Sequence, residues 1–352
     1  MKTNLLIFFS GVLVAAVLVI ATLLQKQPEP PAAPQEPAPP PPAHAPWVEF
    51  FEEIQGDPGV VSQPLVWLAT QHHDDGTWGD GPAALGGERI GKTGLTSLAL
   101  LPFFGAGYTP LSKDRYEFEG GEWCVGVEIR KALDWLRRDQ REDGTFQSPG
   151  GGAFDQVLAA FAFSEAYGLT LHEVWKKSAQ LAVDALAKMQ KPDGTWEGDD
   201  LTPWAIIALY SARLSEIQVD PARIHDALHA AGPPGHPGDV LARVLSKRDE
   251  ARAVWRLEQE TADRDSADVT WWYLAAAAMW AYQGTAGAHW WEYQPGPRWG
   301  PWSRVLREKI LPLLSKEGSV AGKSPSDRIA RTSVVQLTLE ASYGYTCAFM
   351  PH

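Results

Sequence analysis

Three copies of one short phrase divide the sequence into similar units. They read Gln-His-His-Asp-Asp-Gly-Thr-Trp at residues 71–78, Gln-Arg-Glu-Asp-Gly-Thr-Phe at 140–146 and Gln-Lys-Pro-Asp-Gly-Thr-Trp at 190–196. Each copy closes an apolar, helix-like segment, and a second helical segment follows it. The Asp-Gly pair favours the left-handed turn that ends a helix, and the Gln and the aromatic residue are suited to anchor that turn. Because one helical pair cannot bury its apolar face alone, the repetition predicts helical pairs that stack on their neighbours.

Helical periodicity continues to the end of the chain, without a convincing run of alternating strand residues. The expected helical segments are residues 64–70, 92–104, 129–140, 154–167, 172–190, 201–214, 240–261, 268–282, 302–315 and 327–343, with a degraded phrase at 317–320. Amphipathic segments pair with nearly all-apolar ones, which should be buried on all sides. We therefore predict an all-α fold, an α/α toroid of about five or six helical hairpins with the apolar helices as its inner ring; an open solenoid is the alternative.

The N-terminus has the properties of a membrane segment. Residues 5–24 are an almost unbroken apolar run, long enough to cross a bilayer and longer than the core of a cleaved signal peptide. Lys2 precedes the run and Lys26 alone follows it, which weakly favours a cytoplasmic N-terminus and an exported body. We predict a single-pass anchor over residues 1–26 in the inner (cytoplasmic) membrane, with an extracytoplasmic domain; a cleaved signal peptide is the alternative.

A spacer and one large domain follow the anchor. Residues 27–46 are dominated by Pro, Ala and Glu, a composition that favours extended polyproline conformation. Residues 47–352 then form the predicted repeat domain, whose membrane contact would pass through the N-terminal helix.

Composition narrows the possible partners. A net charge of −12 argues against nucleic acid, which needs a basic surface. The only cysteines, Cys124 and Cys347, form no metal-binding motif, so we expect no metal and no cofactor. They could form one disulfide or remain two buried thiols. His72 and His73 end an outer helix, where we expect them at the surface.

Several longer segments resemble one known family. These are residues 91–109 (GKTGLTSLALLPFFGAGYT), 164–170, 200–212 (DLTPWAIIALYSA) and 330–345, together with the repeated phrases. They resemble the prenyltransferase and squalene-oxidase repeat shared by protein prenyltransferase β subunits and triterpene cyclases. The sequence is closer still to membrane-anchored single-toroid repeat proteins of bacteria, over residues 63–345. The resemblance implies an α/α toroid with a cavity inside the inner ring, and for the single-toroid proteins it implies no established activity.

The resemblance raises two kinds of catalysis. Triterpene cyclases protonate an alkene with an Asp-x-Asp-Asp motif at the start of an inner helix. Residues 197–200 (Glu-Gly-Asp-Asp) stand at such a position, so Asp199 and Asp200 are candidate catalytic acids, although the first acid is Glu and both Asp residues also suit helix capping. Zinc-dependent prenyl transfer is disfavoured, because neither Cys124 nor Cys347 has the required Asp two residues before it.

Glycan chemistry is a further alternative, because α/α toroids also host glycosidases that use paired carboxylates. Carboxylates at the expected starts of inner helices could act on or bind a sugar, and nearby indoles could stack on it. The candidate ligand-binding residues are Asp155, Trp204, Asp268, Trp271 and Trp272, with Asp200 as a further acid. Each Asp is also well placed to cap a helix. We expect a domain that binds an apolar or amphipathic ligand or a protein partner, ahead of a terpenoid cyclase-like enzyme or a glycan-binding or glycan-cleaving toroid.

Overall fold

The computed structural model describes residues 59–118, 121–146, 151–198, 201–230, 235–284 and 298–342. All of them fall within one compact unit, Phe50–His352. The predicted anchor (1–26) and spacer (27–46) lie outside the described residues. Among the helices that are described, none is both long and apolar enough to span a bilayer.

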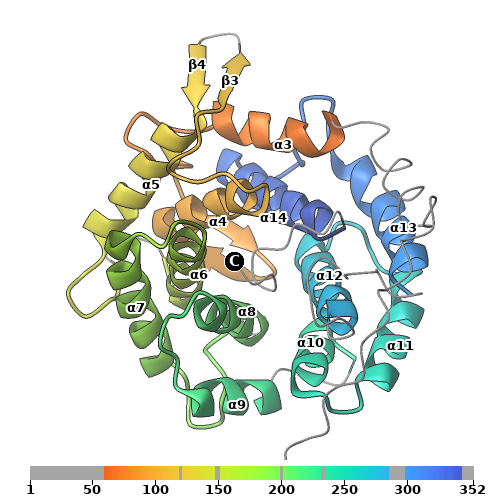
Figure 1. Ribbon diagram of the computed structural model, residues 1–352. Coiled ribbons are helices and arrows are strands. Elements are labelled where there is room, and N and C mark those ends of the chain that lie inside the picture. The colour runs from red at the N-terminus through yellow and green to blue at the C-terminus, as the bar shows by residue number, and fades with distance from the viewer. Residues whose placement is uncertain are drawn as a thin grey trace, which may run out of the picture. The chain divides into compact units, whose positions relative to one another are not determined.

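Twelve helices account for most of the described residues, so the predicted all-α class is confirmed. Figure 1 shows them in two sets that alternate along the chain. The outer set is α3 (Gly59–Thr70), α5 (Val125–Asp139), α7 (Glu173–Lys188), α9 (Pro221–Ala230), α11 (Glu250–Thr261) and α13 (Trp299–Ile310). The inner set is α4 (Lys92–Gly105), α6 (Ala153–Thr170), α8 (Leu201–Leu214), α10 (Pro237–Ser246), α12 (Val269–Gly284) and α14 (Pro325–Ser342).

The outer and inner helices differ in burial, as their amphipathic and apolar sequences predict. Outer helix α5 buries Ile129, Leu133 and Leu136 at helical spacing and leaves its other face to solvent. Inner helix α6 buries every residue from 154 to 168. The inner helices also pack on one another in sequence order, and α14 packs on α4, so this series of contacts returns to its first member.

The repeated phrase forms the same turn each time. Its glycines, Gly76, Gly144 and Gly194, and Gly318 of the degraded phrase have φ of 92°, 87°, 86° and 86°, which favours glycine. In the three full copies the Asp carboxylate accepts hydrogen bonds from the backbone amide and hydroxyl of the Thr two residues later. The indoles of Trp78 and Trp196 donate to the carbonyls of Leu68 and Leu186, at 2.8 and 2.9 Å.

Each of these turns also contacts the next outer helix. A Cβ added at Gly76 would meet the backbone of Lys131 in α5 at 2.7 Å. One added at Gly144 or Gly194 would meet the backbone of α7 or α9 at a still shorter distance. Gly318 lies against Gln63 of α3, the first outer helix described. The last turn therefore makes with the first unit the contact that every other turn makes with its successor.

Two short β-hairpins were not predicted. Strands β1 (Ala83–Leu85) and β2 (Glu88–Ile90) pair antiparallel, as do β3 (Arg115–Phe118) and β4 (Gly121–Cys124). The expectation that no strand interrupts the helices was wrong at these two places. Strands of three or four residues are too short to show an alternating pattern in the sequence.

The predicted helix over residues 240–261 was also wrong. The chain forms α10 and α11 there, with left-handed backbone at Lys247 (φ 53°) and Asp249 (φ 48°) between them. Helix α10 belongs to the inner set and packs on α8 and α12. Its outer neighbour is α9, which the sequence analysis missed.

Candidate functional site

Asp155 is the predicted site residue that lies beside a pocket. It is the third residue of α6, and its side chain is buried, with 4% of the residue exposed. Its Oδ1 accepts a hydrogen bond of 2.8 Å from the backbone amide of Gly91, the N-cap of α4. The carboxyl group lies against Gly91, Gly94 and Gly151, where an added Cβ would collide with it. Glycine at these three positions is therefore what admits the carboxyl group to the start of α4.

Burial raises the pKa of Asp155 to about 6, and the charge of Asp139 acts in the same direction. Hydrogen bonds from the backbone amides of Gly91 and Gly94 oppose this shift because they stabilise the carboxylate. The second oxygen, Oδ2, has no hydrogen-bond partner within the described part of the chain. Asp155 is thus an acid that can exchange a proton close to neutral pH.

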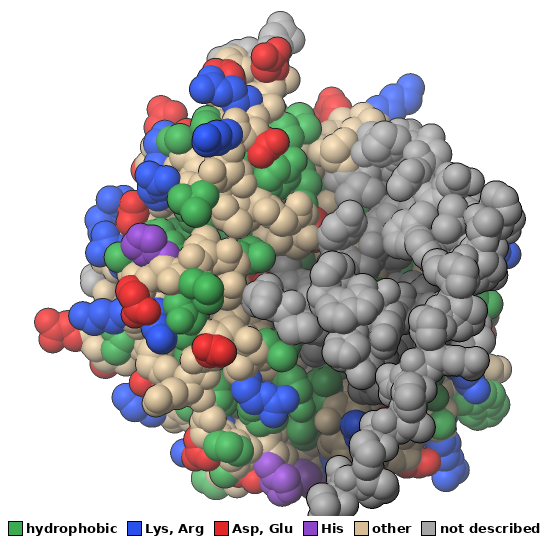
Figure 2. Space-filling view, viewed as in Figure 1, with side chains coloured by type: hydrophobic (Ala, Val, Ile, Leu, Met, Phe, Trp, Pro, Cys, Tyr) green, Lys and Arg blue, Asp and Glu red, His purple; other side chains and the backbone are tan. Residues whose placement is uncertain are grey.

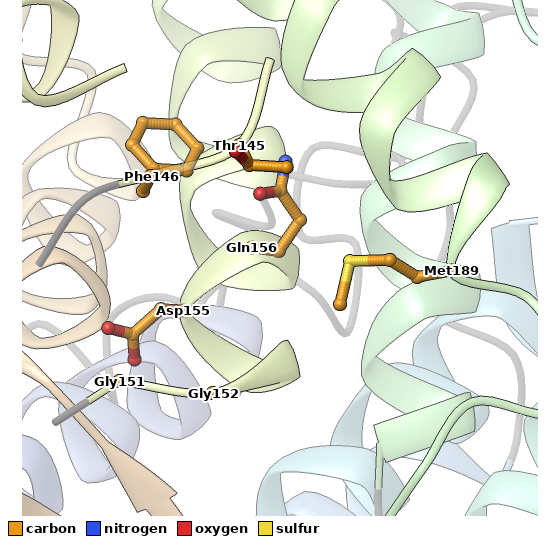
Figure 3. Close-up of a pocket in the computed structure, with 7 residues that line it drawn as sticks. All are labelled: Thr145, Phe146, Gly151, Gly152, Asp155, Gln156 and Met189. Carbon is orange, nitrogen blue, oxygen red and sulfur yellow. The ribbon is translucent and has the colours of Figure 1, made fainter. Parts of the chain in front are cut away.

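The pocket beside Asp155 has a volume of about 190 Å³. Three segments line it: the end of the second repeated turn, the start of α6 and the C-cap of α7. The lining residues are Thr145, Phe146, Gly151, Gly152, Asp155, Gln156 and Met189 (Figure 3). Phe146 and Met189 give it apolar walls, while the Asp155 carboxyl group points toward Gly151.

Gln156 joins two of the segments around this pocket through hydrogen bonds. Its side-chain amide donates to the carbonyl of Gly144 at 3.1 Å and to the carbonyl of Ala182 in α7 at 2.9 Å. One side chain at the start of α6 therefore fixes both the repeated turn and the neighbouring outer helix. The pocket is built on rigid elements, which suits a binding site.

A buried aromatic cluster begins at the residue before Asp155. Phe154 of α6 contacts Trp204 of α8 edge-on, and Trp204 stacks on Tyr273 of α12, with ring centroids 5.5 and 4.7 Å apart. Trp204 is fully buried, and its indole N–H has no acceptor among the described residues. Of the predicted site residues, the structure thus brings Asp155 and Trp204 into one region.

Asp268, Trp271 and Trp272 form a separate group. Asp268 accepts a hydrogen bond of 3.1 Å from the backbone amide of Trp271, which caps α12, and its carboxylate pairs with Arg264. The Arg264 guanidinium also lies over the Trp271 ring, and the Trp272 indole donates to the carbonyl of Asp265. Both indoles are buried, with 2% and 0% exposed, so neither presents a free face for stacking.

Asp199 and Asp200 lie outside the described residues, so their predicted role stays a prediction. Cys347 also lies outside them, and Cys124 is a free, partly buried thiol. Within the described ranges no group of three or more His, Cys, Asp or Glu side chains is arranged to hold a metal ion.

Two buried acids were missed by sequence reasoning. Glu165 of α6 accepts a hydrogen bond of 2.5 Å from the Ser211 hydroxyl of α8, and burial raises its pKa to about 8. Glu340 of α14 accepts from the Gln336 amide at 2.8 Å, and burial raises its pKa well above the usual range. For Glu165 the available signal was an acidic residue within a largely apolar helix. In both, burial favours the neutral form over the carboxylate.

The surface location expected for His72 was wrong. Its side chain is 5% exposed and lies between the rings of Trp78 and Trp123, at 4.7 and 5.7 Å. Burial lowers its pKa to about 4, so it is neutral, 3.6 Å from the carboxylate of Glu128. The ring is a packing element of the first repeat.

Comparison with known proteins leaves the site to be interpreted from its geometry. No known protein family matches the sequence, and no curated protein does so either.

Proposed function

We propose that the chain is a membrane-anchored repeat domain of the prenyltransferase/squalene-oxidase type, and that it binds a ligand rather than transforming it. The membrane anchor of this proposal is the apolar run at residues 5–24, and the Pro-rich residues 27–46 are the spacer that carries the domain away from the bilayer.

The fold of the proposal is a closed α/α toroid of six helical hairpins. Two independent contacts support closure over an open solenoid. Helix α14 packs on α4, and Gly318 lies against Gln63 of α3. An open solenoid would leave its first and last units without such contacts.

The proposed ligand is apolar or amphipathic, and the pocket beside Asp155 is the observation that carries this proposal. Its walls combine the apolar side chains of Phe146 and Met189 with a buried acid, a combination that suits one apolar and one polar group of the same ligand. The buried aromatic contact between Phe154 and Trp204 begins at the residue before Asp155.

Binding is favoured over catalysis because of what the acids contact. The Asp155 carboxyl group is held by the backbone amides at the start of α4, and Asp268 by Arg264 and its own helix. Among the described residues that line the pocket, Asp155 is the only acid, whereas paired-carboxylate chemistry requires a second one across the site. A cyclase-like reaction at Asp199 and Asp200 stays the enzymatic alternative, ahead of a glycan-directed one.

A protein partner is the second candidate, favoured by the filled interior. Trp204 is fully enclosed between Phe154 and Tyr273. The pocket volume of about 190 Å³ is below the roughly 300–1,000 Å³ typical of small-molecule sites. A domain of this kind would bind through its surface.

Native mass spectrometry of the full chain, released from its own membranes in mild detergent, tests the proposal. We expect a retained lipid-like mass that is lost in the Phe146→Ala variant and kept in Trp255→Ala, a control on the exposed face of α11. A bare protein mass for the unmodified chain would reject the ligand and leave the protein partner. Turnover of a retained terpenoid, abolished by Asp199→Asn with Asp200→Asn, would establish the cyclase instead.

A further inference from the structure

Four exposed apolar side chains lie where an inner helix is followed by the next outer helix. Six large hydrophobic residues of the described chain are exposed: Leu111, Val127, Leu171, Val174, Met189 and Trp255. Leu111 lies in the connection from α4 to α5 and Val127 in the first turn of α5, whereas Leu171 ends α6 and Val174 lies in the first turn of α7. We call these four residues the apolar end patch. Figure 2 shows how hydrophobic side chains reach the surface between charged ones on the face drawn there.

Both connections lie at the same end of the domain, because α4, α6 and α8 run parallel. Asp155 brings the start of α6 to Gly91 at the start of α4. Glu165 and Ser211 join α6 to α8 toward the ends of both helices. The helices pack along their lengths, so they also end side by side. The connections that leave them therefore share one end.

Leu111 and Val127 are also neighbours of each other. The backbone of Ser112 lies so close to Gly126 that a Cβ there would collide with it. Arg130, one turn further along α5, donates to the carbonyl of Pro110 at 2.9 Å. Leu111 is therefore held beside the first turn of α5, from which Val127 projects.

Leu171 is the residue that the fold itself does not explain. It ends α6 with left-handed backbone, φ 52°, and is 69% exposed. The equivalent positions after α4, α8 and α10 are also left-handed and exposed, and they hold Gly107, Glu216 and Lys247. A leucine is unfavourable there twice, because its Cβ strains the backbone and its side chain meets water. The other repeats have glycine or a charged residue at this position. A leucine here is therefore explained by a contact that it makes outside the domain.

The first described helix begins at this same end. Helix α3 belongs to the outer set, like α5 and α7, and it contacts β3 of the α4–α5 connection. Its first residue is Gly59, so 58 residues precede it, with the proposed anchor and spacer among them. The end that carries the patch is therefore also the end at which the described chain begins.

We infer that the apolar end patch rests on the surface of the bilayer that holds the anchor. This inference uses the anchor of the proposed function but not its ligand. Four side chains suffice because the tether makes the contact intramolecular, at high effective concentration. Lys113, Lys177, Asp114 and Glu173 flank the patch with both signs of charge, so apolar insertion rather than charge attraction holds it.

Site-specific fluorescence on the full chain in liposomes tests the inference. The native cysteines are replaced (Cys124→Ser, Cys347→Ser), one cysteine is introduced by Leu171→Cys, and it is labelled with nitrobenzoxadiazole. The liposomes are phosphatidylcholine with a minor share of phosphatidylglycerol, containing lipids spin-labelled near the headgroup. Glu142→Cys in the second repeated turn, at the opposite end of the helices, is the matched control.

We expect blue-shifted emission and several-fold stronger quenching at position 171 than at position 142, unchanged in high salt. Val174→Cys should behave like Leu171→Cys, and equal melting temperatures show that each variant is folded. Equal quenching at both ends, or a blue shift without quenching by the lipids, would overturn the inference and assign the patch to a protein or a second copy. Carbonate extraction reports on the anchor separately: a chain that stays in the membrane with position 171 unquenched rejects the patch alone, and a released chain rejects the anchor.

Discussion

Asp155 reaches out of its own helix to cap another one. Its Oδ1 lies 2.8 Å from the backbone nitrogen of Gly91, which is 64 residues earlier in the chain. Gly91 is the N-cap of α4 and has no side chain with which to cap it. The first turn of α6 thus supplies the cap that the sequence of α4 omits, and a buried acid joins two consecutive repeats.

Removing this cap should destabilise the domain. Asp155→Ala leaves the amides of Gly91 and Gly94 without an acceptor, and we expect a loss of about 1–3 kcal/mol in the free energy of unfolding. Asp155→Asn keeps an acceptor oxygen and should lose less than the alanine variant. Urea denaturation at pH 7 measures both. Equal losses in the two variants would show that the hydrogen bond to α4 contributes nothing.

The same residue should make stability depend on pH. The folded-state pKa of Asp155 is about 6, against an ordinary value of 3.8, so the folded state holds a proton that the unfolded state has released. Its contribution is therefore complete below pH 4 and is lost as the pH rises through 6. We expect the contribution of Asp155 to the free energy of unfolding to fall between pH 4 and pH 7, by up to about 3 kcal/mol. Asp155→Asn should flatten that slope, and an unchanged slope would contradict the assignment.

Glu165 should act in a higher pH range. Burial raises its pKa to about 8 from 4.5, so its contribution is complete below pH 4.5 and is lost as the pH rises through 8. Glu165→Gln mimics the protonated form and does not undergo this loss, so at pH 7 the variant should already be the more stable of the two, by up to about 3 kcal/mol. The difference should grow until the pH passes 8. Denaturation of both proteins at pH 7 and pH 9 makes the comparison, and a glutamine variant that is weaker at both would exclude a neutral Glu165.

The buried acid Glu165 and the contact between Asp155 and Gly91 differ in how well the sequence could predict them. Glu165 could have been found, because an acid in the apolar run of α6 must be paired or neutral when buried. The contact between Asp155 and Gly91 could not, because the sequence analysis placed Asp155 correctly near a helix start but assigned the cap to its own helix. Only packing decides which of two adjacent helix starts receives a carboxylate.

The positions of the helices could be predicted where the apolar pattern of the sequence matched the burial of the helix. In α5 and α6 the amphipathic and all-apolar sequences match the outer and inner positions. In α10 they disagree, since this inner helix is short and carries Asp239 and Arg243, which pair with each other at 2.9 Å. The break after it falls at Lys247 and Asp249, and lysine does not ordinarily mark a left-handed turn. Tertiary packing, not local preference, separates α10 from α11.

Comparing Trp204 with Trp196 measures how much an indole hydrogen bond contributes to stability in this core. Both are buried, but Trp196 donates to the carbonyl of Leu186 at 2.9 Å while Trp204 has no acceptor among the described residues. Trp196→Phe removes a hydrogen bond and strands a carbonyl, so it should cost about 1–3 kcal/mol more than Trp204→Phe. Chemical denaturation of the two variants gives the difference. Equal costs would mean that the Trp204 indole has an acceptor, which a bound ligand could supply.

Gly318 offers a test of whether the ring of repeats is closed. Its turn matches that of Gly144, with φ of 86° and 87°, and alanine is strained at both positions. Gly144→Ala also collides with the backbone of Leu181 in α7, so a loss of about 2–4 kcal/mol is expected. In a closed toroid Gly318→Ala meets the backbone of Gln63 at 2.5 Å and should cost as much as Gly144→Ala, in the same cooperative transition. In an open solenoid that contact is absent, and only the smaller backbone strain remains.

Gly152→Ala is the control, because an added Cβ there meets nothing within 4 Å. A loss at Gly318 no larger than about 1 kcal/mol, with Gly144→Ala strongly destabilised, would therefore reject closure.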